Sequence, residues 1–196
     1  MFLLEMCNCA KKMGGGPTPA PPAPPHRRFH AAAAPPSAPA APVQTFPENA
    51  EPTVWGPPVW KALHIAAQFS GTVNHISPWR LVVEAMKTGL PCSDCREHFN
   101  ARVAQVPLRF NNMFTGFRHN RVAVRTTVIN WTTNLHNFVN TANGKPSWTV
   151  QEVATAYGGD RASRIVEARD ALETVNGILG DNLYQALRSL LDLLGN

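Results

Sequence analysis

Charged residues, cysteines and long apolar runs are all scarce in this chain. Only 16% of the 196 residues are charged and 44% are hydrophobic, so we expect one globular domain with accessory segments. Four cysteines are too few for a secreted scaffold held together by disulfides. No apolar stretch is long enough to span a bilayer. The first residues are apolar but lack the positively charged residues that begin a signal peptide. We therefore expect a soluble protein without a signal peptide.

The excess of basic residues is modest, with a formal net charge of +5. Nucleic-acid binding is not expected, because a basic footprint would cluster on one element. The basic side chains that come nearest to forming a cluster lie within residues 109–125. This group has two interpretations, a solvated face or a contact with an anionic cofactor such as a diphosphate. Its members are Arg109, Arg118, His119, Arg121 and Arg125.

Hairpin signals and alternating strand patterns are absent, and the apolar spacing after Trp55 is helical. The sequence therefore predicts an all-α fold, a small bundle of four helices plus a short fifth, with extra C-terminal helices. Thr149 and Glu152 form the capping-box pattern that opens the short fifth helix, which ends near Tyr157. The other predicted helices cover residues 59–69, 78–88, a segment opened by Pro91, 120–141, 161–176 and 181–194.

Proline and alanine dominate residues 14–52, which predicts a disordered, polyproline-like arm rather than a packed segment. At about 3.1 Å per residue such an arm reaches on the order of 100 Å when fully extended. Its free end carries Cys7 and Cys9. We therefore divide the chain into an N-terminal segment, a linker, a central domain and a helical extension, at 1–13, 14–52, 53–158 and 159–196.

Cys92 and Cys95 are three residues apart on a predicted helix, where their side chains share a face and can form a disulfide. The helix start lowers the pKa of the first cysteine most. Half of a zinc site is one alternative, but only Cys7 and Cys9 could complete a four-cysteine set. A thioredoxin-type motif is another, but it needs a βαβ context that is absent. We favour a redox-active disulfide and predict no metal site.

Polar side chains lie in the middle of the helix predicted at 120–141. His136 and Asn140 share a face, with Asn137 beside them, and asparagine inside a helix is costly unless it has a partner. A core histidine satisfied by a neighbour is the simpler interpretation. Trp60 and His64 have the same four-residue spacing on the first helix, so two helices could enclose a flat heteroaromatic ligand.

Taken in order, four motifs resemble the Erv/ALR family of FAD-linked sulfhydryl oxidases over residues 55–157. They are Gly56-Pro-Pro-Val-Trp60-Lys-Ala-Leu63-His64, the Cys92–Cys95 pair, Trp131-Thr-Thr-Asn-Leu135-His136-Asn137-Phe-Val-Asn140 and Gly144-Lys145-Pro146-Ser147-Trp148. The resemblance implies an FAD-dependent enzyme that forms disulfides in protein dithiols and passes electrons to O₂, giving H₂O₂. It also implies a homodimer formed through the first helices.

The resemblance assigns roles to individual residues. Cys95 would be the flavin-proximal thiol and Cys92 the outer thiol that exchanges with substrate. FAD would lie at the mouth of four helices, bound by Gly56, Trp60, His64, Phe69, His136, Asn137, Asn140, Lys145, Trp148 and Tyr157. Cys7 and Cys9 would be a shuttle disulfide, with lipid attachment, an intermolecular disulfide or no role as the alternatives.

Two departures from the family pattern stand out. Thr133 and Val150 occupy the positions of an extra structural disulfide, and Phe69-Ser70-Gly71 replaces an aromatic–proline pair. The compact core suggests a viral protein acting in host cytoplasm or virion, with the mitochondrial intermembrane space as the other compartment. The rival functions are a non-enzymatic helical module that binds zinc or crosslinks partners, and a disulfide reductase or isomerase without flavin.

Overall fold

A computed structural model describes residue 47, residues 49–110 and residues 121–196 of the chain, apart from the Arg121 side chain. Cys7 and Cys9, most of the predicted linker, Arg118 and His119 lie outside these residues. The prediction of an all-α fold is confirmed, since the described residues contain helices and no strand. The elements are α1 (Pro52–Phe69), the short 3₁₀ helix η1 (Val73–His75), α2 (Ile76–Gly89), α3 (Ser93–Gln105), α5 (Arg121–Ala142), α6 (Val150–Tyr157), α7 (Arg161–Glu173) and α8 (Asp181–Gly195).

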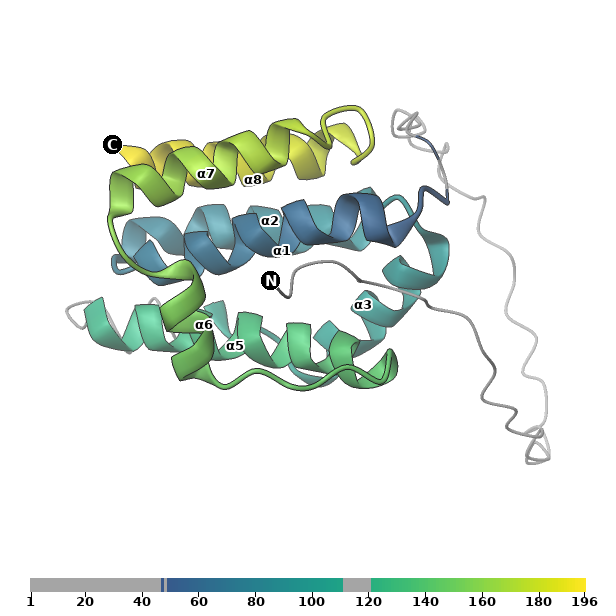
Figure 1. Cartoon of the computed structure of the whole chain (residues 1–196), viewed down its shortest axis with the longest axis horizontal. Helices are drawn as coiled ribbons and strands as arrows, with labels where there is room; N and C mark the ends of the chain where they lie inside the picture. The colour runs from purple at the N-terminus through teal and green to yellow at the C-terminus, as the bar shows by residue number, and fades with distance from the viewer. Residues whose placement is uncertain (1–46, 48, 111–120) are drawn as a thin grey trace, which may run out of the picture. The chain divides into compact units, whose positions relative to one another are not determined.

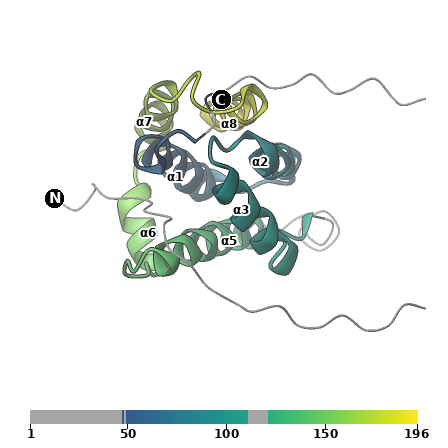
Figure 2. The same cartoon turned by 90° about the vertical axis from the view of Figure 1, so that its right-hand side faces the viewer.

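Helix α1 is central and contacts α5, α6, α7 and α8. Figures 1 and 2 show α7 and α8 side by side over α1 and α2, with α5 on the opposite side of α1. α3 packs against α2, and α6 packs against both α1 and α5. No helix over the described ranges has the length and apolar character needed to cross a membrane.

α1 begins earlier than predicted. It starts at Pro52 instead of Val59, and Pro57 and Pro58 lie inside it although proline removes backbone donors. The additional turns are stabilised by contacts of Trp55. Trp55 is buried, and its indole Nε1 donates to the carbonyl of Ala50 at 3.1 Å.

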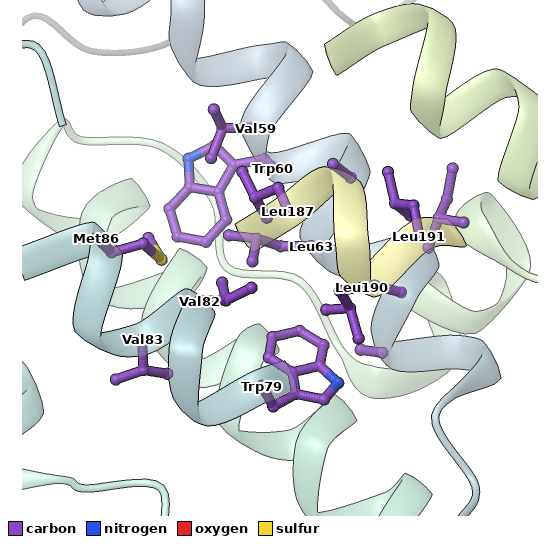
Figure 3. Close-up of a cluster of buried hydrophobic side chains, with 14 of the residues drawn as sticks. Val59, Trp60, Leu63, Trp79, Val82, Val83, Met86, Leu187, Leu190 and Leu191 are labelled. Atoms are coloured by element: carbon purple, nitrogen blue, oxygen red, sulfur yellow. The ribbon is translucent and has the colours of Figure 1, made fainter. Parts of the chain in front are cut away.

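α8 supplies much of the apolar core. Its buried leucines recur every three or four residues and meet Leu63 of α1 and Trp79 of α2 (Figure 3). Burying each such side chain stabilises the fold by about 1.5–3 kcal/mol. The two predicted C-terminal helices are therefore confirmed, and they form part of the same core as α1 and α2.

The Phe69-Ser70-Gly71 departure has a structural explanation. Ser70 is fully buried, and its hydroxyl donates to the carbonyl of Ala66 while accepting a 2.7 Å hydrogen bond from the indole of Trp79. A buried indole N–H needs such a partner. Ser70 therefore provides the hydrogen-bond acceptor for Trp79, the largest fully buried side chain of the core.

Candidate functional site

Cys92 and Cys95 form a disulfide at the start of α3. Cys92 is the N-cap residue, and its sulfur accepts a 3.2 Å hydrogen bond from the backbone N–H of Cys95. The helix begins two residues later than the predicted opening at Pro91. Both cysteines are half-buried, so the sulfurs lie at the surface end of the core. A cysteine sulfur at a helix N-terminus meets unpaired N–H donors, which favour a thiolate.

The chain just before α1 is attached beside this disulfide. The backbone N–H of Ala50 donates to the carbonyl of Pro91 at 3.1 Å. The hydroxyl of Ser93 lies 3.5 Å from the amide oxygen of Asn49. Asn49 and Ala50, which precede α1, therefore lie next to Cys92.

A cavity opens between four helices, with Cys95 in its wall. Gly56 is also in the wall, and a Cβ added there would meet no atom within 4 Å, so the cavity is open at this point. Most of the remaining lining is apolar. The lining residues are Trp55, Gly56, Val59 and Trp60 of α1, Met86 of α2, Leu90 just after it, Cys95, His98, Phe99 and Arg102 of α3, Leu135, Phe138, Val139 and Ala142 of α5, and Asn143.

Four aromatic rings continue from Trp60, and none of the four is in the cavity wall. The ring of His136 stacks on Trp60, with centroids 4.2 Å apart and planes within 4°. His64 stacks on Tyr157 at 4.8 Å, and Trp148 lies 6.2 Å from Tyr157. We call these five side chains the ring cluster. It joins α1, α5, α6 and the loop before α6.

His64 and His136 share one hydrogen bond inside the ring cluster. Nε2 of His64 lies 2.7 Å from Nδ1 of His136, so one ring donates and the other accepts. Burial, followed by the charge of His136, lowers the pKa of His64 to about 3. Burial, followed by the charge of Lys145, lowers the pKa of His136 to about 4. Both rings are therefore neutral at pH 7. The buried Nδ1 of His64 has no hydrogen-bond partner among the described residues.

Asn137 and Asn140 hold the loop that follows α5. The side chain of Asn137 donates to the carbonyl of Trp148 at 2.7 Å and accepts from its N–H at 2.8 Å. Asn140 donates to the carbonyl of Pro146, and its own carbonyl accepts from the N–H of Lys145. These partners offset the cost of asparagine inside a helix. The loop closes back on α5 and brings Trp148 to the ring cluster.

The central part of the chain is similar in sequence to known proteins. Residues 57–158 match the Erv1/Alr family. The chain belongs to the Erv1/Alr family. A protein of Frog virus 3 (isolate Goorha), named as an FAD-linked sulfhydryl oxidase, is 28% identical over 115 residues, covering 56% of this chain and 69% of that protein. An FAD-linked sulfhydryl oxidase from a Namibian warthog isolate of African swine fever virus is 31% identical over 103 residues, covering 48% of this chain and 74% of that protein. No solved structure matches the chain.

The resemblance stated from the motifs is thus confirmed, whereas the roles of individual residues in this Erv1/Alr chain stay predictions. Gly56, Trp60 and Cys95 line the cavity, and five of the other predicted cofactor residues lie in or beside the ring cluster. Those five are His64, His136, Asn137, Trp148 and Tyr157. Among the described residues, Phe69 is neither in the cavity wall nor in a ring contact with the cluster; it is the last residue of α1.

Several wall residues were missed by the sequence analysis. Phe99 and Arg102 lie four and seven residues after Cys95, so helical periodicity from the redox cysteine could have found them. The guanidinium of Arg102 lies 4.8 Å above the ring of Phe138 from α5. A cation is thereby held over an aromatic ring at the wall of the cavity.

The two positions of the missing structural disulfide differ from each other. Thr133 is buried in α5, and its hydroxyl has no hydrogen-bond partner among the described residues. Val150 is the first residue of α6 and is 42% exposed. The α5–α6 connection therefore depends on the Asn137 hydrogen bonds to Trp148 instead of a disulfide.

Proposed function

We propose that this chain is an FAD-dependent thiol oxidase that forms disulfides in protein dithiols and passes the electrons to O₂, giving H₂O₂. The observation that carries the proposal is a disulfide with one of its cysteines, Cys95, in the wall of a mostly apolar four-helix cavity. The viral relatives named as FAD-linked sulfhydryl oxidases support it. A zinc-binding or crosslinking module would not need this cavity.

The residues present fit FAD. The cavity is lined mostly by apolar side chains and is open where Gly56 lacks a Cβ, which suits a flat ring system beside Cys95. The amide oxygen of Asn143 is buried in its wall without a hydrogen-bond partner in the described part of the chain. Nδ1 of His64, in the ring cluster, is also buried without a hydrogen-bond partner among the described residues. Unpaired buried polar atoms are costly, and a ligand with polar edges would satisfy them.

FAD, when bound, supplies a two-electron acceptor that can react with O₂. We assign Gly56 and Trp60 to the ring system near Cys95. We assign His64, His136 and Tyr157, with the loop held by Asn137 and Asn140, to the remainder of the cofactor. The nearby side chain of Lys145, whose charge already reaches His136, would offset a diphosphate. The predicted contact of Phe69 has no support from its position.

The disulfide chemistry follows from the positions of the two sulfurs. A substrate thiolate attacks Cys92 Sγ, the S–S bond breaks, and Cys95 leaves as a thiolate toward the cavity. The second substrate thiol then attacks the mixed disulfide, so the substrate gains a disulfide and Cys92 becomes a thiol. Two electrons now reside on Cys92 and Cys95 as a dithiol, and a bound FAD would supply the acceptor that allows the Cys92–Cys95 disulfide to reform. Cys95 takes the cofactor-facing role because it lines the cavity.

Cys7 and Cys9 are proposed to shuttle electrons from substrates to Cys92. The attachment of Asn49 and Ala50 beside Pro91 supports this proposal, because it starts the arm next to the core disulfide. A polyproline-like arm of about 40 residues, extended at about 3.1 Å per residue, spans on the order of 100 Å, which is long enough to bring the pair to the core disulfide of its own or of a second subunit. The pair lies outside the described residues.

Domain limits and oligomeric state are also proposals. We keep 53–158 as the oxidase domain and 159–196 as its extension, with 1–13 and 14–52 as the arm. The predicted homodimer would need a surface other than the faces of α1 and α2 that α7 and α8 cover. Light scattering coupled to size-exclusion chromatography measures the mass directly.

The proposal is tested by the colour and oxygen consumption of the purified protein. We expect a yellow protein with stoichiometric FAD that consumes O₂ on dithiothreitol, and Cys92→Ser and Cys95→Ser variants that do not. A colourless protein that contains zinc would favour the non-enzymatic module. Flavin-free disulfide exchange without O₂ uptake would favour a reductase or isomerase.

A further inference from the structure

Helix α6 packs against α1 and α5 with few buried side chains, although it carries Tyr157 of the ring cluster. Over its eight residues, only Val153 is fully buried. Its first turn is closed locally by the capping box of Thr149 and Glu152. The position of Tyr157 therefore depends on what holds the other end of the helix.

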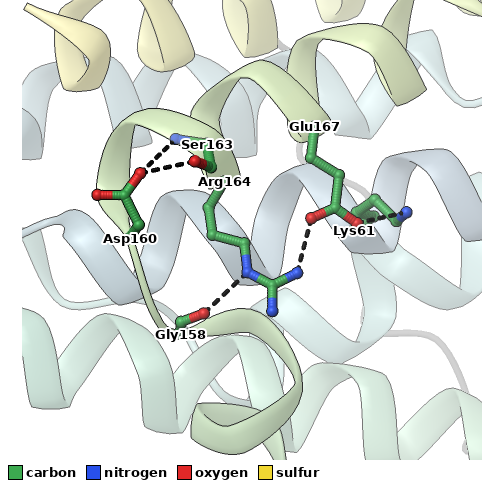
Figure 4. Close-up of polar contacts among 6 residues, drawn as sticks. All are labelled: Lys61, Gly158, Asp160, Ser163, Arg164 and Glu167. Atoms are coloured by element: carbon green, nitrogen blue, oxygen red, sulfur yellow. Dashed lines mark hydrogen bonds and ion pairs between the residues drawn. The ribbon is translucent and has the colours of Figure 1, made fainter.

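Helix α7 holds that end. The guanidinium Nε of Arg164 donates to the carbonyl of Gly158, the residue after Tyr157, at 2.8 Å (Figure 4). A second guanidinium nitrogen binds the carboxylate of Glu167 at 2.7 Å. The other oxygen of that carboxylate accepts from the ammonium of Lys61 at 2.9 Å. We call these three side chains the α7 brace.

The brace connects both walls of the ring cluster. Lys61 directly follows Trp60 on α1, and Gly158 directly follows Tyr157 on α6. One carboxylate on α7 therefore fixes the spacing between the helix that carries Trp60 and the helix end that carries Tyr157. Hydrogen bonds from Lys61 and Arg164 lower the pKa of Glu167, so its carboxylate is charged at neutral pH.

Stability alone is a weak reason for this arrangement. The charged side chains are about one third exposed, and ion pairs of that exposure contribute little free energy. Geometry is the larger effect, because the network joins three helices at two points adjacent to stacked rings. Position 158 also requires glycine, since a Cβ there would clash with the backbone carbonyl oxygen of Ala154.

We propose that Arg164 and Glu167 are positioning residues of the FAD site, placed in it by the C-terminal extension. The match to the Erv1/Alr family ends at residue 158, before either residue. The inference rests on the proposed FAD function. Packing of α8 on α2 does not require Arg164 or Glu167. The proposal therefore gives the extension a further role, in the cofactor site.

The test compares FAD affinity among three variants of the full chain in which glutamine removes one charge. Arg164→Gln and Glu167→Gln each break the brace. Arg188→Gln is the matched control, because it removes ion pairs to Glu173 and Asp192 within the same helix pair, away from the ring cluster. FAD is titrated into the apoprotein and its fluorescence quenching gives Kd; thermal unfolding of each apoprotein is measured alongside.

We expect each brace variant to raise the FAD Kd about fivefold to tenfold, with a changed visible circular dichroism of the bound flavin. The control variant should leave both at the wild-type value. Wild-type affinity in both brace variants would overturn the inference while leaving the FAD function intact. An equal loss in the control would also overturn it, since the effect would then come from general loosening of α7 and α8. If the wild-type chain takes up no FAD, the proposed function fails as well.

Discussion

The buried histidine pair should make the fold sensitive to mild acid. His64 and His136 are both neutral in the folded chain, with pKa values of about 3 and about 4, against 6.5 for an ordinary histidine. Between pH 6.5 and about 4 the unfolded chain therefore binds protons that the folded chain does not. Stability is complete above pH 6.5 and falls as the pH decreases through this window.

The magnitude follows from the width of the window. One pKa unit corresponds to about 1.4 kcal/mol, and pH 5 lies about 1.5 units below the ordinary histidine pKa. Each histidine should therefore cost about 2 kcal/mol of unfolding free energy between pH 7 and pH 5, and the pair about 4 kcal/mol. Since small domains have about 5–15 kcal/mol in total, this loss is large.

Urea denaturation of the FAD-free protein at pH 7, 6 and 5 measures the effect. His64→Gln removes one of the two titrating rings, so its loss between pH 7 and pH 5 should be about 2 kcal/mol smaller than that of the wild type. His98→Gln is the control, because His98 is an exposed histidine of α3. A His64→Gln protein with the full wild-type acid sensitivity would refute the reasoning from the buried pair.

Two further substitutions test the packing and the loop. Gly89→Ala should lower the unfolding free energy by about 1–3 kcal/mol in urea denaturation, because the new Cβ would lie 2.6 Å from that of Leu183 on α8; an unchanged midpoint would contradict this close approach. Asn137→Ala should cost about 1–3 kcal/mol because the polar backbone groups of Trp148 lose their partner, and it should weaken FAD binding in a fluorescence titration. Wild-type FAD affinity in Asn137→Ala would show that the loop does not contribute to FAD binding.

Local signals in the sequence predicted the elements that depend on local contacts. The α6 start is an example, since both members of the Thr149–Glu152 capping box lie within four residues. The first turns of α1 were missed because Pro57 and Pro58 argue against a helix, whereas the buried Trp55 and its bond to Ala50 stabilise it. The burial of Trp55 depends on tertiary packing and cannot be read from propensity.

The functional site shows the same difference between features set by local sequence and features set by tertiary contacts. The family motifs identified Trp60 and the histidines, but the partner of Asn137 depends on how the loop folds back to Trp148, eleven residues away. The link between Lys61 and Glu167 joins positions 106 residues apart, which no periodic pattern indicates. Contacts of this kind appear only once the helices are packed.

Anaerobic reduction of the flavin is the most direct test of the central claim. The FAD-loaded wild-type protein is mixed with dithiothreitol without oxygen, and the visible flavin absorbance is followed in wild type and in Cys95→Ser. The account predicts rapid bleaching in the wild type, recovery of the colour on admitting O₂, and no rapid bleaching in the variant. Equal bleaching in Cys95→Ser, or a wild-type flavin that dithiothreitol does not reduce, would contradict it.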